Sequence, residues 1–241
     1  MCALQTLSRL ALIPGGGPAV GRWGVPSVPP APATLALAGL AGRFVELSGR
    51  GASGLASLAL RLVVEAQREG RQVAWVSLCP ARMRRRATPF YAADAAANGI
   101  DLAALPVVLA ADLLEAGRAA SHLLRSGAFA LVVLDLVALD EAEPTEGRPR
   151  EVELPLPLQS RLTGLAQTHG AVLLALTTKP PDAASLGSLV SLHGHVRRTR
   201  ARASSADGRA LFELEVAVHK DKRNGPGWTH REVFVGPEGL T

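Results

Sequence analysis

The sequence predicts an α/β fold with a mostly parallel central sheet and antiparallel strands at its C-terminal edge. Short apolar runs alternate with helical patterns between residues 43 and 176, which is typical of a parallel sheet covered on both faces. The runs at 129–134 and 171–176 are continuous, as expected for strands buried on both faces. After residue 189 the pattern changes to alternating apolar and polar residues, which favours antiparallel strands.

The local patterns place each element in order. Helices are expected to stop at Gly70 and Gly99, because glycine readily adopts the left-handed conformation after a last helical turn. In the parallel part we expect strands at 43–48, 72–78, 106–110, 129–134 and 171–176, with helices at 54–69, 89–98, 111–125 and 156–169. In the last third we expect strands at 189–198, 210–219 and 230–235, with turns at Asp207-Gly208 and 224–227 and a Pro- and charge-rich loop at 141–157.

The chain divides into a Pro/Gly-rich N-terminal arm, residues 1–33, and a core domain, residues 34–241. Closely spaced prolines and glycines in the first segment disfavour a regular helix or an inner strand. Two interpretations stay open: a tail without a role, or an arm that docks through Trp23. The 241 residues are 48% hydrophobic but only 4% aromatic, so the core must consist of Leu, Val and Ala.

Composition also restricts the class of protein. The net charge of +5 is compatible with nucleic acid or with an acidic partner. Cys2 and Cys79 are too few for a disulfide framework or a metal-binding motif, and His193 and His195 have no third ligand nearby. No secretory signal is visible at the start, and no apolar run reaches the roughly 18 residues needed to cross a membrane. We therefore expect a cytoplasmic protein without metal or membrane contact.

A glycine-rich loop follows the first predicted strand and opens the first helix. This is the setting of a phosphate-binding P-loop, G-x-x-x-x-G-K-[ST], and both glycines fit. Leu55, however, stands where the lysine would bind phosphate, and Ala56 stands where a hydroxyl would bind Mg²⁺. We interpret the segment as a degenerate nucleotide loop that consists of Gly49, Arg50, Gly51, Ala52, Ser53, Gly54, Leu55 and Ala56.

Five segments in the right order resemble the RecA recombinase core, over residues 35–241. The strand that ends at Asp135 resembles the Walker B strand, and Lys220 and Lys222 match the paired lysines of a late strand. The five segments are 90–91, 98–102, 124–129, 131–135 and 218–222. The resemblance implies a RecA-like P-loop NTPase core. It also makes Lys220 and Lys222 candidates for a RecA interface, since in RecA such lysines reach the neighbouring protomer's ATP.

The departures from RecA fall on the positions that carry its chemistry. By this resemblance Cys79 replaces the activating glutamate and Thr178 replaces the glutamine that senses the γ-phosphate. Phosphoryl transfer depends on electrostatic placement of such groups. We therefore expect no catalytic residue, no cofactor and no ATP hydrolysis, with Asp135 a Walker B remnant that caps its strand.

Within this class, a short chain with an eroded P-loop resembles ImuA, the accessory protein of bacterial mutasomes; the cell-division inhibitor SulA is a less similar relative. The ImuA resemblance implies an interaction or regulatory factor in SOS-induced translesion DNA synthesis. Its implied partners are RecA, an ImuB-like Y-family polymerase homologue and an error-prone DNA polymerase III alpha subunit, and any DNA contact would be indirect.

Two alternatives stay open: a divergent ATP-binding enzyme or ATPase of the RecA class, and a protein that binds DNA directly. Two arginine clusters could contact phosphates or an acidic partner. The expected counterparts of RecA's DNA-binding loops, 141–157 and 179–188, lack the combination of positive charge and aromatic rings that single strands require. The arginines concerned are Arg82, Arg84, Arg85, Arg86, Arg198 and Arg200.

Overall fold

The computed structural model describes residues 35–80, 90–137, 154–204 and 210–235. The predicted arm at 1–33, the turn at Asp207-Gly208 and most of the loop at 141–157 lie outside these residues. The arginine cluster at 82–86 lies outside them as well. What the sequence predicts for these segments stays a prediction.

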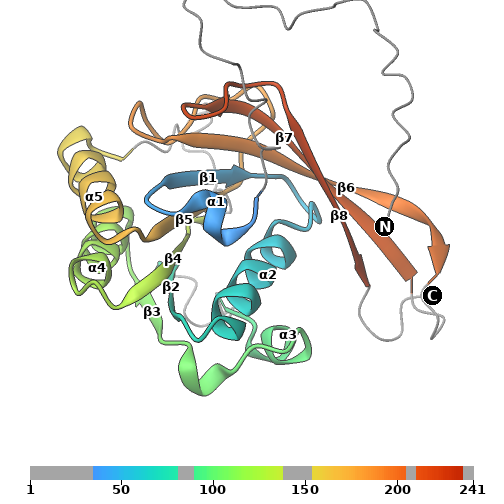
Figure 1. Ribbon diagram of the computed structural model, residues 1–241, viewed down its shortest axis with the longest axis horizontal. Helices are drawn as coiled ribbons and strands as arrows, with labels where there is room; N and C mark the ends of the chain where they lie inside the picture. The colour runs from blue at the N-terminus through green and yellow to red at the C-terminus, as the bar shows by residue number, and fades with distance from the viewer. Residues whose placement is uncertain (1–34, 81–89, 138–153, 205–209, 236–241) are drawn as a thin grey trace, which may run out of the picture. The chain divides into compact units, whose positions relative to one another are not determined.

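An eight-stranded sheet forms the centre of the described structure, in the order β3-β2-β4-β5-β1-β6-β7-β8 (Figure 1). Its first six strands are parallel and its last two run antiparallel to their neighbours, which confirms the predicted class of fold. The strands are β1 (Phe44–Ser48), β2 (Gln72–Leu78), β3 (Val107–Ala110), β4 (Phe129–Asp135), β5 (Val172–Thr177), β6 (Leu192–Ser204), β7 (Ala210–Asp221) and β8 (Thr229–Val235).

One strand differs from its prediction. Residues 189–198 were expected to form an antiparallel edge strand, but β6 begins at Leu192 and pairs in parallel with β1 over four residues. On its other side it pairs antiparallel with β7 as far as Ser204. The alternating pattern of β6 is typical of either kind of pairing, so only the neighbouring strands decide it.

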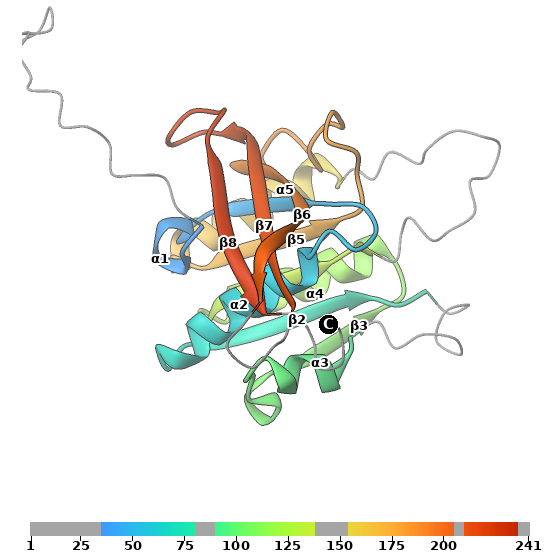
Figure 2. The ribbon, with the colours of Figure 1, turned by 90° about the vertical axis from the view of Figure 1, so that its right-hand side faces the viewer.

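Helices cover both faces of the sheet (Figures 1 and 2). Helix α2 packs on one face, against β2, β4 and β5, while α4 and α5 pack on the other, against β1 to β5. The two apolar clusters that result consist almost wholly of Leu, Val and Ala, as the composition predicts. The helices are α1 (Leu37–Leu40), α2 (Leu55–Arg68), α3 (Ala92–Ala97), α4 (Leu113–Arg125) and α5 (Leu156–His169), with a 3₁₀ turn at Leu102–Ala104.

Helix boundaries follow capping contacts that periodicity does not reveal. Helix α4 begins two residues later than predicted, because the Asp112 carboxylate accepts a hydrogen bond from the Glu115 N–H at 2.8 Å. Within the described residues α3 is shorter than the predicted 89–98 and begins at Ala92. The short α1 and the 3₁₀ turn were not predicted, because one or two turns show no periodicity.

Strands β6, β7 and β8 form an antiparallel extension that we call the wing. In Figure 2, β7 and β8 cross in front of α2. Glu232 of β8 forms an ion pair with Arg61 of α2, with Oε2 and Nε 3.0 Å apart. Leu214 of β7 packs on Gly54, immediately before α2. The wing therefore covers the amino-terminal half of the helix that a P-loop would open.

Candidate functional site: the glycine-rich loop after β1

The loop between β1 and α2 depends on Gly54. This residue has φ +83° and directly precedes the helix, a left-handed conformation that a side chain would strain. A Cβ atom at Gly54 would also lie 2.3 Å from Cδ2 of Leu214. The second glycine of the P-loop pattern is thus needed here for the turn and for packing of the wing, independently of any phosphate.

Residues of the neighbouring strands β5 and β6 contact the loop and hold it in place. A Cβ atom at Gly49 would lie 2.5 Å from Ser53 Oγ and 3.0 Å from the Val196 carbonyl oxygen of β6. The Gly49 N–H donates a hydrogen bond to the Thr177 carbonyl oxygen of β5 at 3.0 Å. Ser53 is buried against Gly49, whereas Arg50 is exposed. The loop is held by the fold's own contacts.

The two positions that carry phosphate chemistry hold apolar side chains with different surroundings. Leu55 is 6% exposed and belongs to the apolar cluster on the α2 side of the sheet. Ala56 is exposed at the first turn of α2. An ammonium in the place of Leu55 would enter an apolar environment, where an unpaired charge is costly.

Three further positions lie at the carboxyl ends of neighbouring parallel strands. Asp135 ends β4 and is in register with Ser77 of β2. Cys79, which follows β2, is a buried free thiol. Thr178 follows β5, and its hydroxyl lies 3.5 Å from the carbonyl oxygen of Val137. Ligands of open α/β sheets bind at such strand ends. These ends bring Asp135, Cys79 and Thr178 to the edge of the sheet where the loop also lies.

The Asp135 carboxyl has a pKa raised from 3.8 to about 6. Burial is the main cause, because it disfavours the charged carboxylate. The hydrogen bond from the Val137 N–H at 3.2 Å and the nearby side chains of Trp75 and Ser77 lower the pKa and offset only part of this effect. At neutral pH the charged Asp135 therefore costs folding free energy.

We expect Asp135→Asn to stabilise the protein at pH 7.5 by about 1–3 kcal/mol. Because the folded pKa exceeds the unfolded value of 3.8, the folded state binds the proton more tightly, and stability falls as the pH rises from about 4 to about 6. The neutral amide avoids this loss and keeps the acceptor for the Val137 N–H. Urea unfolding at pH 7.5 and pH 4 measures the effect, which should be much smaller at pH 4. An equal effect at both pH values would rule out the carboxylate charge as its cause.

A buried polar network lies behind the loop and was not predicted. Glu46, fully buried in the middle of β1, accepts hydrogen bonds from the Thr177 hydroxyl at 2.9 Å and from the Leu186 N–H at 2.5 Å. Its Oε1 also lies 2.9 Å from Lys179 Nζ. A carboxylate within an otherwise apolar strand run is the signal that sequence reasoning could have used.

Ser48 and His193 extend this polar region to β6. The Ser48 Oγ and His193 Nε2 atoms are 3.0 Å apart, and both side chains are buried. Burial lowers the pKa of His193, and the nearby Glu46 carboxylate offsets part of this effect. Because neither group is open to a substrate, the pair is structural and not a nucleophile with its base.

The network holds the segment that precedes β6. Buried Gln159 of α5 accepts from the Leu189 N–H at 3.2 Å and donates to the Leu154 carbonyl oxygen at 2.5 Å. Glu46 holds the same segment at Leu186. The carboxyl-terminal half of the predicted counterpart of a DNA-binding loop, 179–188, is thus fixed by side chains from α5 and β1.

The two lysines that resemble RecA's late-strand pair contact the same segment. Lys220 Nζ donates to Ser185 Oγ at 3.2 Å and lies 3.3 Å from the carbonyl oxygens of Gly187 and Ser188. Lys222 Nζ donates to the Ser188 carbonyl oxygen at 2.8 Å. Both ammonium groups have acceptors within the chain, and their role in a RecA interface stays a prediction.

The structure describes the side chain of only one of the arginines predicted to contact phosphates or an acidic partner. Arg198 is exposed on the α2 side of the wing, with its guanidinium carbon 5.5 Å from the centre of the Phe212 ring. Arg200 lies in β6 by its backbone, and its side chain is outside the described residues, as are Arg82 and residues 84–86.

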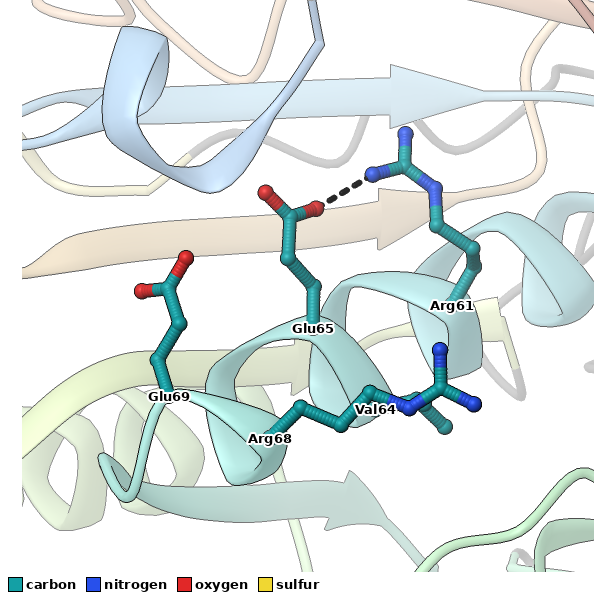
Figure 3. Close-up of a pocket in the computed structure, with 5 residues that line it drawn as sticks. All are labelled: Arg61, Val64, Glu65, Arg68 and Glu69. Atoms are coloured by element: carbon teal, nitrogen blue, oxygen red, sulfur yellow. Dashed lines mark hydrogen bonds and ion pairs between the residues drawn. The ribbon is translucent and has the colours of Figure 1, made fainter.

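A pocket of about 330 Å³ lies on α2 (Figure 3). It is lined by Arg61, Val64, Glu65, Arg68 and Glu69 and contains none of the loop residues 49–56. In Figure 3 the Arg61–Glu65 ion pair lies on one side of it. The pocket is therefore separate from the nucleotide loop. Among the described residues no group of three His, Cys, Asp or Glu side chains could hold a metal ion, and no helix is long and apolar enough to cross a membrane.

The strand order, the glycine-rich loop after β1 and the carboxylate at the end of β4 define a RecA-like fold. The crystal structure of the RadB recombinase is similar, with a TM-score of 0.53 and 16% sequence identity over 80% of this chain and 87% of that chain. At this identity the likeness shows the fold alone. No protein-family model and no curated protein matches the sequence.

Proposed function

We propose that this chain is a catalytically inactive RecA-like protein that acts by binding other macromolecules. Its role would be that of an interaction or regulatory factor in SOS-induced translesion DNA synthesis, in the cytoplasm, as in the ImuA family that the sequence resembles. Its partners would be RecA, an ImuB-like polymerase homologue and an error-prone DNA polymerase III alpha subunit.

The observation that carries this proposal is the environment of Leu55. A RecA-class enzyme needs an ammonium at this position to bind the β- and γ-phosphates. Here the side chain is apolar and buried in the core. The absence of the lysine and of the Mg²⁺-binding hydroxyl at Ala56 should cost about 3–6 kcal/mol of triphosphate binding. This corresponds to about two to four decades of affinity.

The surroundings of a third chemical position support the same proposal. Cys79, in the place of the activating glutamate, is a buried thiol that offers no carboxylate to a water molecule. The fold is kept while the groups for phosphate chemistry are replaced, which favours a binding role over a divergent ATPase.

We expect purified protein to bind ATP–Mg²⁺ no more tightly than the high micromolar range and to show no ATP turnover. Titration calorimetry measures the affinity, and phosphate release measures the turnover. Since a ligand stabilises the folded state appreciably only when its concentration reaches its dissociation constant, the melting temperature should not respond to micromolar ATP. A sub-micromolar affinity, or turnover stimulated by DNA, would instead establish the alternative of a divergent ATPase.

The proposed partner is tested with purified RecA. The protein should sediment with RecA filaments formed on single-stranded DNA with a non-hydrolysable ATP analogue, and not with the DNA alone. Sedimentation with bare DNA would support the alternative of a direct DNA-binding protein. If it sediments with neither, the proposed role with RecA is wrong.

A further inference from the structure

One face of the wing is basic, and no helix of the described residues packs on it. Helices α4 and α5 pack on the same side of the sheet over β1 to β5, and in Figure 1 the wing extends beyond them. Exposed or half-exposed cationic and histidine side chains lie along the carboxyl end of β1, along β6 and on β7 and the turn after it. We call this set the basic face; it consists of Arg50, His195, Arg197, His219 and Lys222.

The strands themselves place these residues together. Alternate residues of a strand point to one face. Val196 belongs to the apolar cluster on the α2 side, so His195 and Arg197 point to the opposite side. On β7 the pairing with β6 shifts by one residue between Val218 and Lys220, so His219 lies in a β-bulge where alternation does not fix its side. The His219 ring centre lies 6.3 Å from that of His193, whose side chain contacts Ser48 on the helix-free side.

The acidic groups nearby are already engaged. Glu215 is clamped between Arg197 and Arg231 across three strands, with Oε1 2.7 Å from Arg197 Nε and Oε2 2.7 Å from an Arg231 terminal nitrogen. Its side chain is only 10% exposed, whereas those of Arg197 and Arg231 are 63% and 65% exposed. Glu213 of the same face also lies 3.6 Å from Arg231, so these two carboxylates offset the two guanidinium groups, and the positive excess at the surface comes from Arg50 and Lys222.

The charges around His195 agree with this excess of positive charge on the face. Burial lowers the pKa of His195, and the positive neighbours His219, Arg197 and Arg50 lower it further. Glu46, a further carboxylate on this side of the sheet, is fully buried beside Lys179 and presents no charge to the surface.

The chemistry of the face favours a peptide over a single-stranded nucleic acid. Single-strand binding surfaces combine positive charge with aromatic rings on which bases stack. Among the described residues of this face there is no Phe, Tyr or Trp. The wing's stacked rings, Phe212 and Phe234, pack with the cluster on the α2 side instead.

We propose that the basic face docks an acidic segment of a partner protein in an extended conformation. Side chains on one face of an extended peptide repeat about every 6.6–7 Å, which equals the spacing of His195 and Arg197 along β6. Glutamates at alternate positions of the segment would therefore meet the His195 imidazole, which can donate a hydrogen bond, and the Arg197 guanidinium. Arginine clusters recognise acidic motifs in this way. The inference rests on the proposed role as a binding protein and adds the chemistry of one partner.

The probe is a fluorescein-labelled dodecapeptide of alternating Glu and Ser, with binding followed by fluorescence anisotropy in 50 mM salt. The triple variant Arg50→Ala, Arg197→Ala, Lys222→Ala removes three charges from the face. The matched control Arg68→Ala, Arg118→Ala, Arg161→Ala removes three exposed charges from α2, α4 and α5. We expect the face variant to bind at least tenfold more weakly than wild type and the control within twofold of it.

Equal affinity of the two variants would overturn the inference. A second binding experiment uses a labelled oligo(dT) of 20 nucleotides in place of the peptide. If it binds more tightly than the peptide and only the face variant loses it, the face is a nucleic-acid site and the inference is wrong. Filament sedimentation separates this result from the proposed function. Normal RecA binding with no face-dependent peptide binding rejects the inference alone, and face-dependent peptide binding without RecA binding rejects the RecA role alone.

Discussion

Replacing Asp221 by alanine should lower the free energy of unfolding by about 3–5 kcal/mol. The Asp221 carboxylate is buried at the end of β7 and forms an ion pair with buried Arg43, with Oδ1 and a terminal nitrogen 2.6 Å apart. It also accepts hydrogen bonds from the Asn224 side chain at 3.0 Å and from Trp228 Nε1 at 3.1 Å. Alanine would leave a buried guanidinium without its partner and would release the turn before β8. Urea denaturation measures the loss.

Glu69→Ala is the matched control, because Glu69 also pairs with an arginine but both side chains are well exposed. Exposed pairs contribute about 0–1 kcal/mol, so this variant should stay close to wild type. A loss below about 1 kcal/mol for Asp221→Ala would show that the buried pair adds little to stability.

The pKa of Asp221 implies a dependence of its contribution on pH. Burial raises this pKa, but hydrogen bonds from the Arg223 N–H, the Arg43 guanidinium and Asn224 outweigh burial and hold it below its usual value of 3.8. A lowered pKa in the folded state stabilises the protein above the unfolded pKa. The difference between wild type and Asp221→Ala should therefore be constant from pH 5 to 8 and diminish as the pH falls below about 4.

A loss of similar size, about 3–5 kcal/mol, is expected for Glu46→Ala. This substitution removes the acceptor of the Leu186 N–H and of the Thr177 hydroxyl and leaves the Lys179 ammonium with the Ala184 carbonyl oxygen but no carboxylate. All these groups are buried or nearly so, and an unmade buried hydrogen bond costs its full desolvation penalty. The segment before β6 should also become more mobile, which hydrogen exchange at Leu186 would measure.

Glu46→Gln keeps one acceptor oxygen and almost the same volume, so it should lose less stability than Glu46→Ala. Glu232→Ala is the control for a partly exposed pair, with Arg61, and should cost about 1 kcal/mol or less. If Glu46→Ala unfolds like Glu232→Ala, the network does not hold the segment before β6.

Most of the fold could be predicted because its strands are long apolar runs with clear boundaries. The strand predicted at 129–134 and the one at 171–176 lie within one residue of β4 and β5. These strands are buried on both faces, so their composition alone identifies them. The predicted helix at 156–169 matches α5, since Gly170 adopts the left-handed conformation that ends it.

The candidate site could be predicted only in part. The positions of Leu55 and Ala56 relative to Gly49 and Gly54 follow from local spacing, which a sequence displays directly. The interior network could not be predicted in this way, since Glu46 meets Leu186 and Arg43 meets Asp221 across 140 and 178 residues of chain. Local patterns carry no information about contacts at such separations.

The sequence by itself determined the alternation of strands and helices, the Leu-, Val- and Ala-rich core and the apolar side chains in the nucleotide loop. Each of these depends on near neighbours in the chain and on the preference of apolar surface for burial. Only the tertiary structure decided that β6 pairs in parallel with β1, that Leu214 packs on Gly54 and that Lys220 and Lys222 contact the segment before β6. It also brought His195, Arg197 and His219 to one face, because the order of strands in a sheet sets which side chains meet there.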